Sequence, residues 1–178
     1  QLYLSQEFWQ SCGVVHLDFN AQEKKRNQLL AQQQCSLYQY VNHNELSEIA
    51  GMDFHIGGLF WRNGGWIHPR AMVKQLLQHP NIQVFEHTEL LDFNYQNNAW
   101  QLFTNTSKND CVDSVVFCTG ANKNLMAKLG LTIFQIRGQT DNVVANSFSG
   151  SLKIALSGAS YISPAWQNAH CFGATFSP

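Results

Sequence analysis

The alternation of apolar and polar residues predicts two strand regions and two helices in the first third of the chain. Residues 13–19 alternate as a strand does, and residues 21–34 form a polar stretch typical of an exposed helix. A short second helix is expected to begin at its N-cap Asn44 and to end at Gly51, where a glycine permits a left-handed turn. Residues 57–66 contain two apolar runs around an Asn-Gly pair, which predicts a tight hairpin.

The middle of the chain is expected to form one helix followed by strands. Pro69 suits the first position of a helix that runs to about residue 78. The apolar stripe of this helix is expected to be buried, and it consists of Met72, Val73, Leu76 and Leu77. Four strands are expected next, at residues 82–85, 88–95, 99–104 and 112–118. Within the last of these, residues 115–118 are expected to be among the most buried.

The last third of the chain is expected to be rich in strands. A helix should follow residues 119–122 and close at Gly130. The strand candidates after it are residues 133–139, 141–146, 152–157, 161–162 and 169–176. Because so many short strands follow one another closely, we expect an α+β fold with a mixed, antiparallel-rich sheet.

Composition narrows the classes of protein to which the chain can belong. Apolar residues make up 44% and charged residues 13%, so the chain folds around a core. A net charge of −1 provides no overall basic field, so any contact with nucleic acid must be local. The basic cluster at residues 24–26 is interpreted as a solvated helix face rather than an anion site. No apolar run is long enough to cross a membrane, and five cysteines without a Cys-x-x-Cys pair favour a reducing cytoplasm.

Few residues suggest catalysis by side chains. The seven histidines show no spacing typical of metal ligands, so no metal is expected. Cys118 and Cys171 lie in apolar runs, where burial raises the pKa of a thiol and makes it unreactive, so we expect packing roles rather than nucleophiles. The most specific feature is residues 115–121 (VVFCTGA), an apolar run that ends in small residues. At such a strand end the backbone can closely approach a flat cofactor.

Five segments that span nearly the whole chain carry a family resemblance. They are residues 9–17 (WQSCGVVHL), 57–77 (GGLFWRNGGWIHPRAMVKQLL), 118–121 (CTGA), 138–139 (GQ) and 161–176 (YISPAWQNAHCFGATF). Their order resembles the FAD-dependent amine oxidases typified by D-amino acid and glycine oxidases. Within this family, the chain is most similar to the oxidase module of bifunctional tRNA-modifying enzymes, which also carry a methyltransferase module.

The resemblance implies two lobes. Residues 1–63 and 131–178 would form a substrate lobe, and residues 64–130 an incomplete α/β FAD-binding lobe. The sequence lacks the Gly-x-Gly-x-x-Gly loop with which such FAD lobes begin, so it contains no diphosphate cradle. We therefore interpret the chain as an excised piece of an FAD enzyme, and expect it to bind FAD weakly or not at all.

The resemblance also implies a set of site residues. The positions that match cofactor-facing residues of the family are Gly64, Gly65, Trp66, Leu90, Cys118, Thr119 and Gly120. Tyr161 matches a tyrosine on the roof of the substrate pocket, and the alternative is a half-buried strand aromatic. Arg137 could hold a carboxylate, but it lies beside the crossover between the lobes. The substrate-binding arginine of the family would fall beyond residue 178, and we assign no catalytic side chain.

The reaction that the resemblance implies is oxidation of a carboxymethylaminomethyl group on the wobble uridine of tRNA, which removes the carboxymethyl unit. The flavin accepts a hydride from the carbon beside the amine, so no side-chain nucleophile is required. The tRNA would be a partner of the full-length enzyme. Two other functions stay open: a small-molecule amine oxidase related to glycine oxidase, and a non-catalytic interaction module built on the same lobe.

Overall fold

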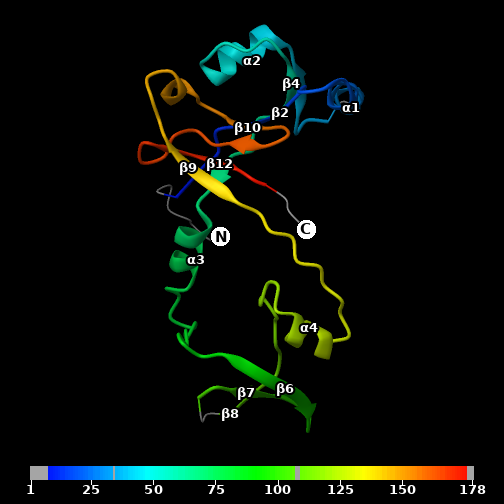
Figure 1. The fold of residues 1–178 in the computed structure, drawn as a ribbon, viewed down its shortest axis with the longest axis vertical. Coiled ribbons are helices and arrows are strands. Elements are labelled where there is room, and N and C mark those ends of the chain that lie inside the picture. Colours follow the sequence, from blue (N-terminus) through cyan, green and yellow to red (C-terminus); the bar gives the residue numbers. More distant parts are fainter. Residues whose placement is uncertain (1–7, 34, 107–108, 176–178) are drawn as a thin grey trace. The chain divides into compact units, whose positions relative to one another are not determined.

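The chain folds into two compact units. The computed structural model describes residues 8–33, 35–106 and 109–175. The first unit contains the chain up to Leu76 and from Arg137 onward, and the second unit is Leu77–Ile136. Strands with a few short helices make up both units, so the expected α+β class is confirmed in this coarse form (Figure 1). None of the helices in the described residues is long and apolar enough to cross a bilayer.

The boundaries between the two units differ from the expected lobe boundaries, which were at residues 63/64 and 130/131. Residues 64–76 belong to the first unit, because strand β5 (Trp66–Ile67) pairs antiparallel with strand β1 (Trp9–Gln10). Residues 131–136 belong to the second unit. The assignment of substrate and FAD roles to the two lobes stays a prediction.

A mixed sheet organises the first unit. Within the described residues its strand order is β3-β4-β2-β10-β11-β12-β9. The strands are β2 (Val14–Leu17), β3 (Gln39–Val41), β4 (Gly58–Trp61), β9 (Thr140–Val144), β10 (Ala155–Ser157), β11 (Tyr161–Ile162) and β12 (Ala169–Gly173). Strand β2 pairs parallel with β10, whereas the other described pairs of this sheet are antiparallel. The expected mixed, antiparallel-rich sheet is therefore present.

The core of the first unit lies between helix α2 (His43–Ala50) and the sheet. Leu46 and Ala50 of this helix are fully buried and belong to one cluster with Val15 and Phe60. Leu46 and Ala50 are four residues apart, and residues with this spacing lie on the same face of a helix. The burial of this face stabilises the short helix more than its intrinsic propensity does.

The ends of α2 are set by local chemistry. Its N-cap is Asn42, so the expectation that Asn44 caps the helix is wrong. The Asn42 side chain accepts hydrogen bonds from the N–H groups of Asn44 and Glu45, and the Glu45 carboxylate accepts one from the Asn42 N–H. This reciprocal pair is a capping box. Gly51 ends the helix in the left-handed conformation, with φ 77°, as predicted.

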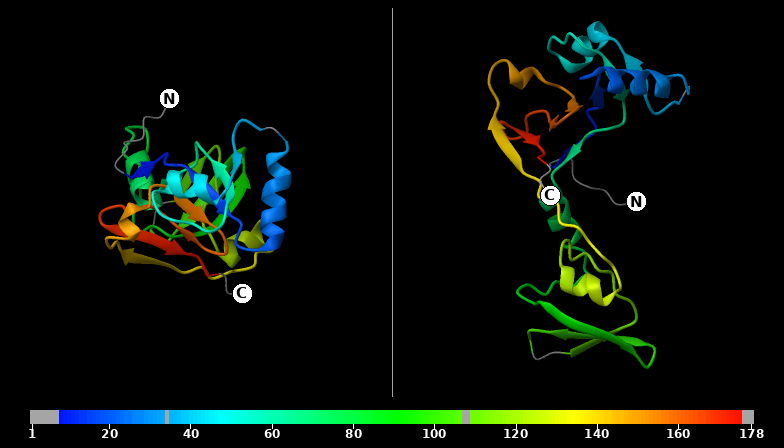
Figure 2. Two further views of the ribbon diagram at one scale, coloured as in Figure 1. Left: turned by 90° about the horizontal axis from the view of Figure 1, so that it is seen from above. Right: turned by 45° about the vertical axis from the view of Figure 1, so that its right-hand side comes forward.

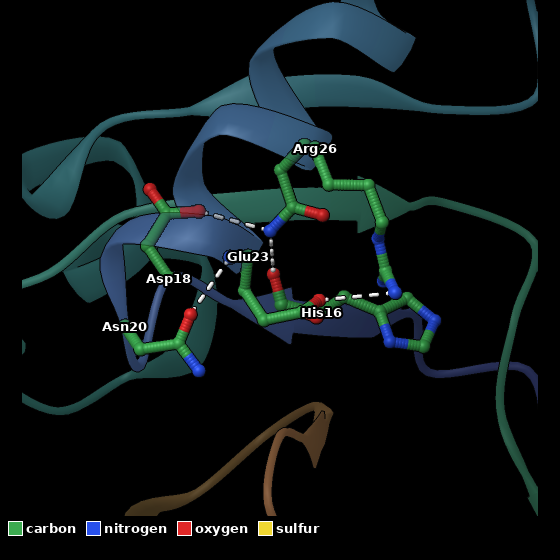
Figure 3. A network of polar contacts seen from close by, with 6 residues as sticks. His16, Asp18, Asn20, Glu23 and Arg26 are labelled. Carbon is green, nitrogen blue, oxygen red and sulfur yellow. Dashed lines mark hydrogen bonds and ion pairs between the residues drawn. The ribbon is translucent and has the colours of Figure 1, made fainter.

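Helix α1 (Ala21–Ala31) confirms the predicted polar helix but ends earlier than expected, because residues 32 and 33 form a turn; residue 34 lies outside the described residues. The Asn20 side chain caps it by accepting a 2.8 Å hydrogen bond from the Glu23 N–H. Arg26 and Glu23 form an ion pair of 3.0 Å on its surface (Figure 3). The basic residues Lys24, Lys25 and Arg26 are exposed, as the solvated-face interpretation requires.

A buried amide attaches α1 to the sheet. Asn27 is fully buried, and its Nδ2 donates to the His16 carbonyl oxygen at 3.0 Å and to Asp18 Oδ1 at 2.9 Å (Figure 3). The Tyr40 hydroxyl donates to the other oxygen of Asp18 at 2.7 Å. Burial raises the pKa of Tyr40, and the Asp18 carboxylate adds to this effect. These bonds satisfy a carboxylate that is almost fully buried.

The predicted hairpin at residues 57–66 is wrong. Strand β4 pairs with β2 and β3, and β5 pairs with β1 instead of with β4. Gly64 closes a turn, because its N–H donates to the Trp61 carbonyl oxygen at 3.1 Å, but the strands on either side of that turn do not pair with each other. Gly64 also makes a close contact with the residues at the start of β2. The Gly13 N–H donates to the Gly64 carbonyl oxygen at 2.8 Å, and a Cβ on Gly64 would lie 2.7 Å from the Val14 side chain.

Helix α3 (Pro69–Leu76) begins at Pro69 as predicted. Its apolar stripe is less buried than expected. Met72 and Leu76 are half-buried, but Val73 and Leu77 are exposed. The prediction of a buried stripe is therefore wrong for Val73 and Leu77.

The second unit contains a three-stranded antiparallel sheet within its described residues, drawn in green in Figure 2. Its strands are β6 (Leu90–Gln96), β7 (Ala99–Thr104) and β8 (Asn109–Val112). Helix α4 (Lys123–Lys128) has the N-cap Asn122, and Gly130 follows it with φ 72°. Lys128 Nζ lies 2.5 Å from Asp92 Oδ1, and the Phe93 and Phe117 ring centroids are 4.8 Å apart. These contacts connect the helical segment to β6.

Two predicted strands, at residues 82–85 and 133–139, do not form, and of the strand predicted at 112–118 only Val112 lies in a strand, β8. Residues 115–118 form no strand, and Val116 is 85% exposed, so the expectation that this segment is among the most buried is wrong. Within the described residues, no neighbouring strand pairs with 115–118. An apolar run becomes a strand only when a neighbour satisfies its backbone N–H and C=O groups, so this run stays irregular.

We expect Asn27→Ala to lower the free energy of unfolding by about 1–3 kcal/mol, because it removes the buried amide that donates to the His16 carbonyl oxygen and to Asp18 Oδ1. Urea denaturation followed by tryptophan fluorescence measures the change. Gln22→Ala is the matched control, since it removes an exposed amide from the same helix. Equal stability of the two variants would contradict a role for Asn27 in attaching α1.

Candidate functional site

A pocket of about 920 Å³ opens in the first unit, beside β10, β11 and β12. Its walls bring together two distant parts of the sequence, residues 65–70 and residues 140–171. The side chains that give it chemical character are Trp66, His68, Arg70, Tyr161 and Trp166. Two residues predicted from the sequence, Trp66 and Tyr161, therefore share one pocket.

Aromatic rings form one part of the pocket wall. The Trp166 ring centroid lies 5.1 Å from that of His68 and 5.9 Å from that of Trp66, with interplanar angles of 51° and 53°. Such tilted arrangements are favourable for aromatic pairs. The three rings therefore support one another from separate segments of the chain.

Trp166 stands at the end of a two-residue turn. Its N–H donates to the Ala169 carbonyl oxygen at 2.8 Å, and the Ala169 N–H donates back to the Trp166 carbonyl oxygen at 3.1 Å. The central residues Gln167 and Asn168 have φ values of 50° and 64°. Positive φ at both positions is typical of a type I′ turn, so the backbone of Trp166 is firmly held.

His68 holds the start of α3. Its N–H donates to the Phe8 carbonyl oxygen at 2.7 Å, and its Nδ1 accepts a hydrogen bond from the Ala71 N–H at 3.2 Å. The ring therefore satisfies one of the free N–H groups at the helix N-terminus, as an N-cap does. Arg70 follows in the first turn, where it is exposed and lines the pocket.

Tyr161 is 41% exposed on β11 and lines the same pocket. Burial raises the pKa of its phenol, and the neighbouring Cys171 raises it further. The phenol is therefore protonated at neutral pH, and its O–H is hydrogen-bonded to Cys171, which also lines the pocket. Its position suits both the substrate-roof interpretation and that of a half-buried strand aromatic, so its role stays a prediction.

A buried histidine fixes β12 behind the pocket. His170 is 1% exposed, with Nδ1 2.8 Å from the Ser163 carbonyl oxygen and Nε2 3.0 Å from Ser149 Oγ. Because a carbonyl only accepts, Nδ1 carries a proton. The Ser149 hydroxyl can then donate to Nε2 while its oxygen accepts from the Asn146 N–H at 3.1 Å. Both ring nitrogens and the Ser149 hydroxyl therefore have hydrogen-bond partners.

Gly64 and Gly65 have a packing role in the first unit. A Cβ on Gly65 would overlap the carbonyl oxygen of Gln10. Gly64 also lines a smaller pocket of about 500 Å³, together with His16 and Trp61. Burial lowers the pKa of His16, and Arg26 lowers it further. The role of the two glycines toward a cofactor stays a prediction.

The other predicted cofactor residues lie in the second unit. Leu90 is half-buried on β6, whereas Cys118, Thr119 and Gly120 are exposed. Cys118 is therefore not the buried packing residue that the sequence predicted, because the run before it forms no strand. A Cβ on Gly120, whose φ is 57°, would meet nothing within 4 Å.

The fit of these residues to FAD is incomplete. Small side chains and open backbone at Thr119 and Gly120 suit the edge of a flat ligand. A diphosphate, however, requires the N–H groups of a glycine-rich loop at a helix N-terminus, and this sequence has no Gly-x-Gly-x-x-Gly. The described residues therefore do not form a complete dinucleotide site.

Two further expectations concerned Arg137 and a metal site. Arg137 is exposed, donates from Nη2 to Gln139 Oε1 at 2.9 Å, and does not line the 920 Å³ pocket. Within the described part of the chain, no group of three or more His, Cys, Asp or Glu residues is arranged to hold a metal ion.

Sequence reasoning missed the roles of His68, Arg70 and Trp166 in the pocket wall. His68 and Trp166 lie in the motifs that carry the family resemblance, but nothing local to either residue indicates that they meet. The available signal for Arg70 was a basic residue in the first turn of a helix that begins at a proline, where acidic residues are favoured.

Comparison with known sequences gives long matches. Residues 4–178 match the family model described as FAD dependent oxidoreductase. The tRNA 5-methylaminomethyl-2-thiouridine biosynthesis bifunctional protein MnmC of Chromobacterium violaceum is 37% identical over 174 residues, and that of Pseudomonas putida (strain W619) is 33% identical over 170. Each match covers 94% of this chain but only 26% of the relative. The chain thus spans about a quarter of the length of these relatives.

Solved structures of low sequence identity share the fold. Glycine oxidase from Geobacillus kaustophilus superimposes with a TM-score of 0.78 at 21% identity, covering 96% of this chain and 49% of that one. Glycine oxidase from Bacillus cereus gives a TM-score of 0.76 at 18% identity, covering 96% and 50%. The family model spans both compact units and nearly the whole sequence. The chain belongs to the FAD dependent oxidoreductase family.

Proposed function

We propose that this chain is part of an FAD-dependent oxidoreductase that removes the carboxymethyl group from carboxymethylaminomethyl-uridine at the wobble position of tRNA. The observation that carries this proposal is the 37% identity, over 94% of the chain, with a protein named for 5-methylaminomethyl-2-thiouridine biosynthesis. That relative is also named as bifunctional, so we extend the proposal to a parent with an additional methyltransferase module. Its place of action would be the cytoplasm, and the free thiols of all five cysteines suit that compartment.

In this proposal the first unit provides most of the substrate lobe and the second unit the middle part of the FAD lobe. Bound flavin supplies the difficult step, because it accepts a hydride from the carbon beside the substrate amine. The polypeptide then has to bind the substrate and orient that carbon. The aromatic pocket supports this division of roles, since it offers shape and hydrogen-bond donors but no activated nucleophile.

The residues that we propose to face the cofactor are those named from the sequence: Gly64, Gly65, Trp66, Leu90, Cys118, Thr119 and Gly120. The open space around Gly120, where a Cβ would meet nothing within 4 Å, supports this proposal. Tyr161 is proposed as a substrate contact, because its protonated phenol lines the pocket.

A small-molecule amine oxidase is the alternative, and the fold similarity to two glycine oxidases favours it. The 37% identity to a protein named for tRNA modification favours the tRNA substrate. The pocket volume of about 920 Å³ does not separate the two substrates, because its lining includes Gly65 and Trp66, which we propose to face the flavin.

The test uses the complete protein encoded by the full reading frame. Transfer RNA that carries carboxymethylaminomethyl-uridine is incubated with it, and the nucleosides are analysed by mass spectrometry. We expect the aminomethyl nucleoside to appear. Oxidation of glycine without any change in the tRNA would establish the small-molecule alternative. A complete protein with neither flavin nor activity would favour the interaction module.

We expect Tyr161→Phe in the complete protein to lower turnover on the modified tRNA by a modest factor, about 3- to 10-fold, because one hydrogen bond to the substrate is removed. Steady-state kinetics measure the change, and the absorbance of bound flavin is the control, which should stay at the wild-type level. Unchanged kinetics would make Tyr161 a packing residue, and loss of flavin would place it next to the cofactor.

For the 178-residue chain alone, we expect weak FAD binding or none, because its sequence lacks the diphosphate loop. Mixing the purified chain with FAD, followed by gel filtration and an absorbance spectrum, measures the bound flavin. We also expect no substrate-dependent peroxide. Stoichiometric, tight flavin binding or peroxide production would contradict this interpretation.

A further inference from the structure

We propose that the pocket wall recognises one nucleotide of the RNA substrate, with Trp166 stacking on the base and Arg70 binding a phosphate. This inference rests on the proposed function, because it assigns a nucleotide to the same pocket. Both residues line the pocket although they come from distant parts of the sequence. An aromatic ring beside a cation is the combination by which proteins bind unpaired nucleotides.

Trp166 has the properties of a stacking surface. It is half-buried and lines the open volume, so part of its ring remains available to a ligand. His68 and Trp66 support it at 5.1 and 5.9 Å, and both are tilted by about 50° from its plane. The two-residue turn at Gln167 and Asn168 fixes its backbone. A base can therefore stack on Trp166 with little loss of conformational entropy.

Arg70 has no evident structural reason for its charge. It lies in the first turn of α3, where the helix dipole disfavours a cation, and that turn contains no acidic residue. Within the described residues, neither of the two ion pairs involves Arg70. A guanidinium that is exposed at the pocket and unpaired by a carboxylate can bind a phosphate oxygen.

This local recognition agrees with the charge of the chain. A net charge of −1 cannot attract RNA by a general basic field. One stacking residue and one cation are sufficient to position a single nucleotide, while affinity for the rest of the RNA comes from elsewhere. The free amino acid substrates of a small-molecule oxidase would need neither a base platform nor a phosphate contact.

The experiment measures binding by the complete protein with its flavin. The probes are a fluorescently labelled anticodon stem-loop that carries the modified uridine and the free modified nucleoside. We expect Trp166→Ala to weaken binding of both probes by about 5- to 150-fold, the range for loss of one stacked base, and Trp166→Phe to weaken it less. We expect Arg70→Gln to weaken binding of the stem-loop alone and to reduce the slope of log Kd against log salt by about 1.

Arg62→Gln is the matched control, since Arg62 is also exposed but does not line the pocket. Flavin absorbance should stay unchanged in every variant. Wild-type affinity in Trp166→Ala, or an equal loss in Arg62→Gln and Arg70→Gln, would overturn the proposal. Weaker nucleoside binding by Arg70→Gln would show that Arg70 holds the substrate carboxylate and would overturn the phosphate assignment. A wild-type enzyme that oxidises glycine but leaves tRNA unchanged would instead refute the proposed function.

Discussion

The parallel ladder between β2 and β10 is the interaction on which the first unit depends. It joins Val14–His16 to Ala155–Ser157 and therefore connects the two separate parts of the chain that make up this unit. Val15 and Ile154, which are almost completely buried, lie in the hydrophobic core beside it. The pocket takes its walls from both parts. The pocket can therefore form only when this long-range pairing does, and its geometry is a property of the whole unit.

The elements that sequence reasoning predicted correctly are those specified by nearby residues. Pro69 and Gly51 determine a helix start and a helix end through their own backbone preferences. The hairpin at 57–66 and the strand at 115–118 failed because pairing depends on distant partners. Gly64 lies against the Val14 side chain, where a Cβ would not fit. Residues 115–118 have no strand with which to pair among the described residues. An apolar pattern alone therefore could not predict either structure.

The same distinction explains the predictions about the site. Tyr161 and Trp66 were predicted because each matches a site position of the family, and the structure places both at one pocket. Trp166 and Arg70 lie in the same motifs but were missed, because their shared place in the pocket wall depends on the turn at Gln167 and Asn168 and on the position of α3. The predicted set of cofactor residues spans both units, so only the sequence resemblance relates its two parts.

Specificity in such a family has to come from the pocket wall rather than from the fold. Two glycine oxidases share this fold at about 20% identity, so the same backbone accommodates very different side chains. Because the flavin carries out the oxidation, the polypeptide can change its substrate without changing the chemistry. A tryptophan on a rigid turn, and an arginine without an ion pair among the described residues, are the side chains by which we propose this wall selects a nucleotide.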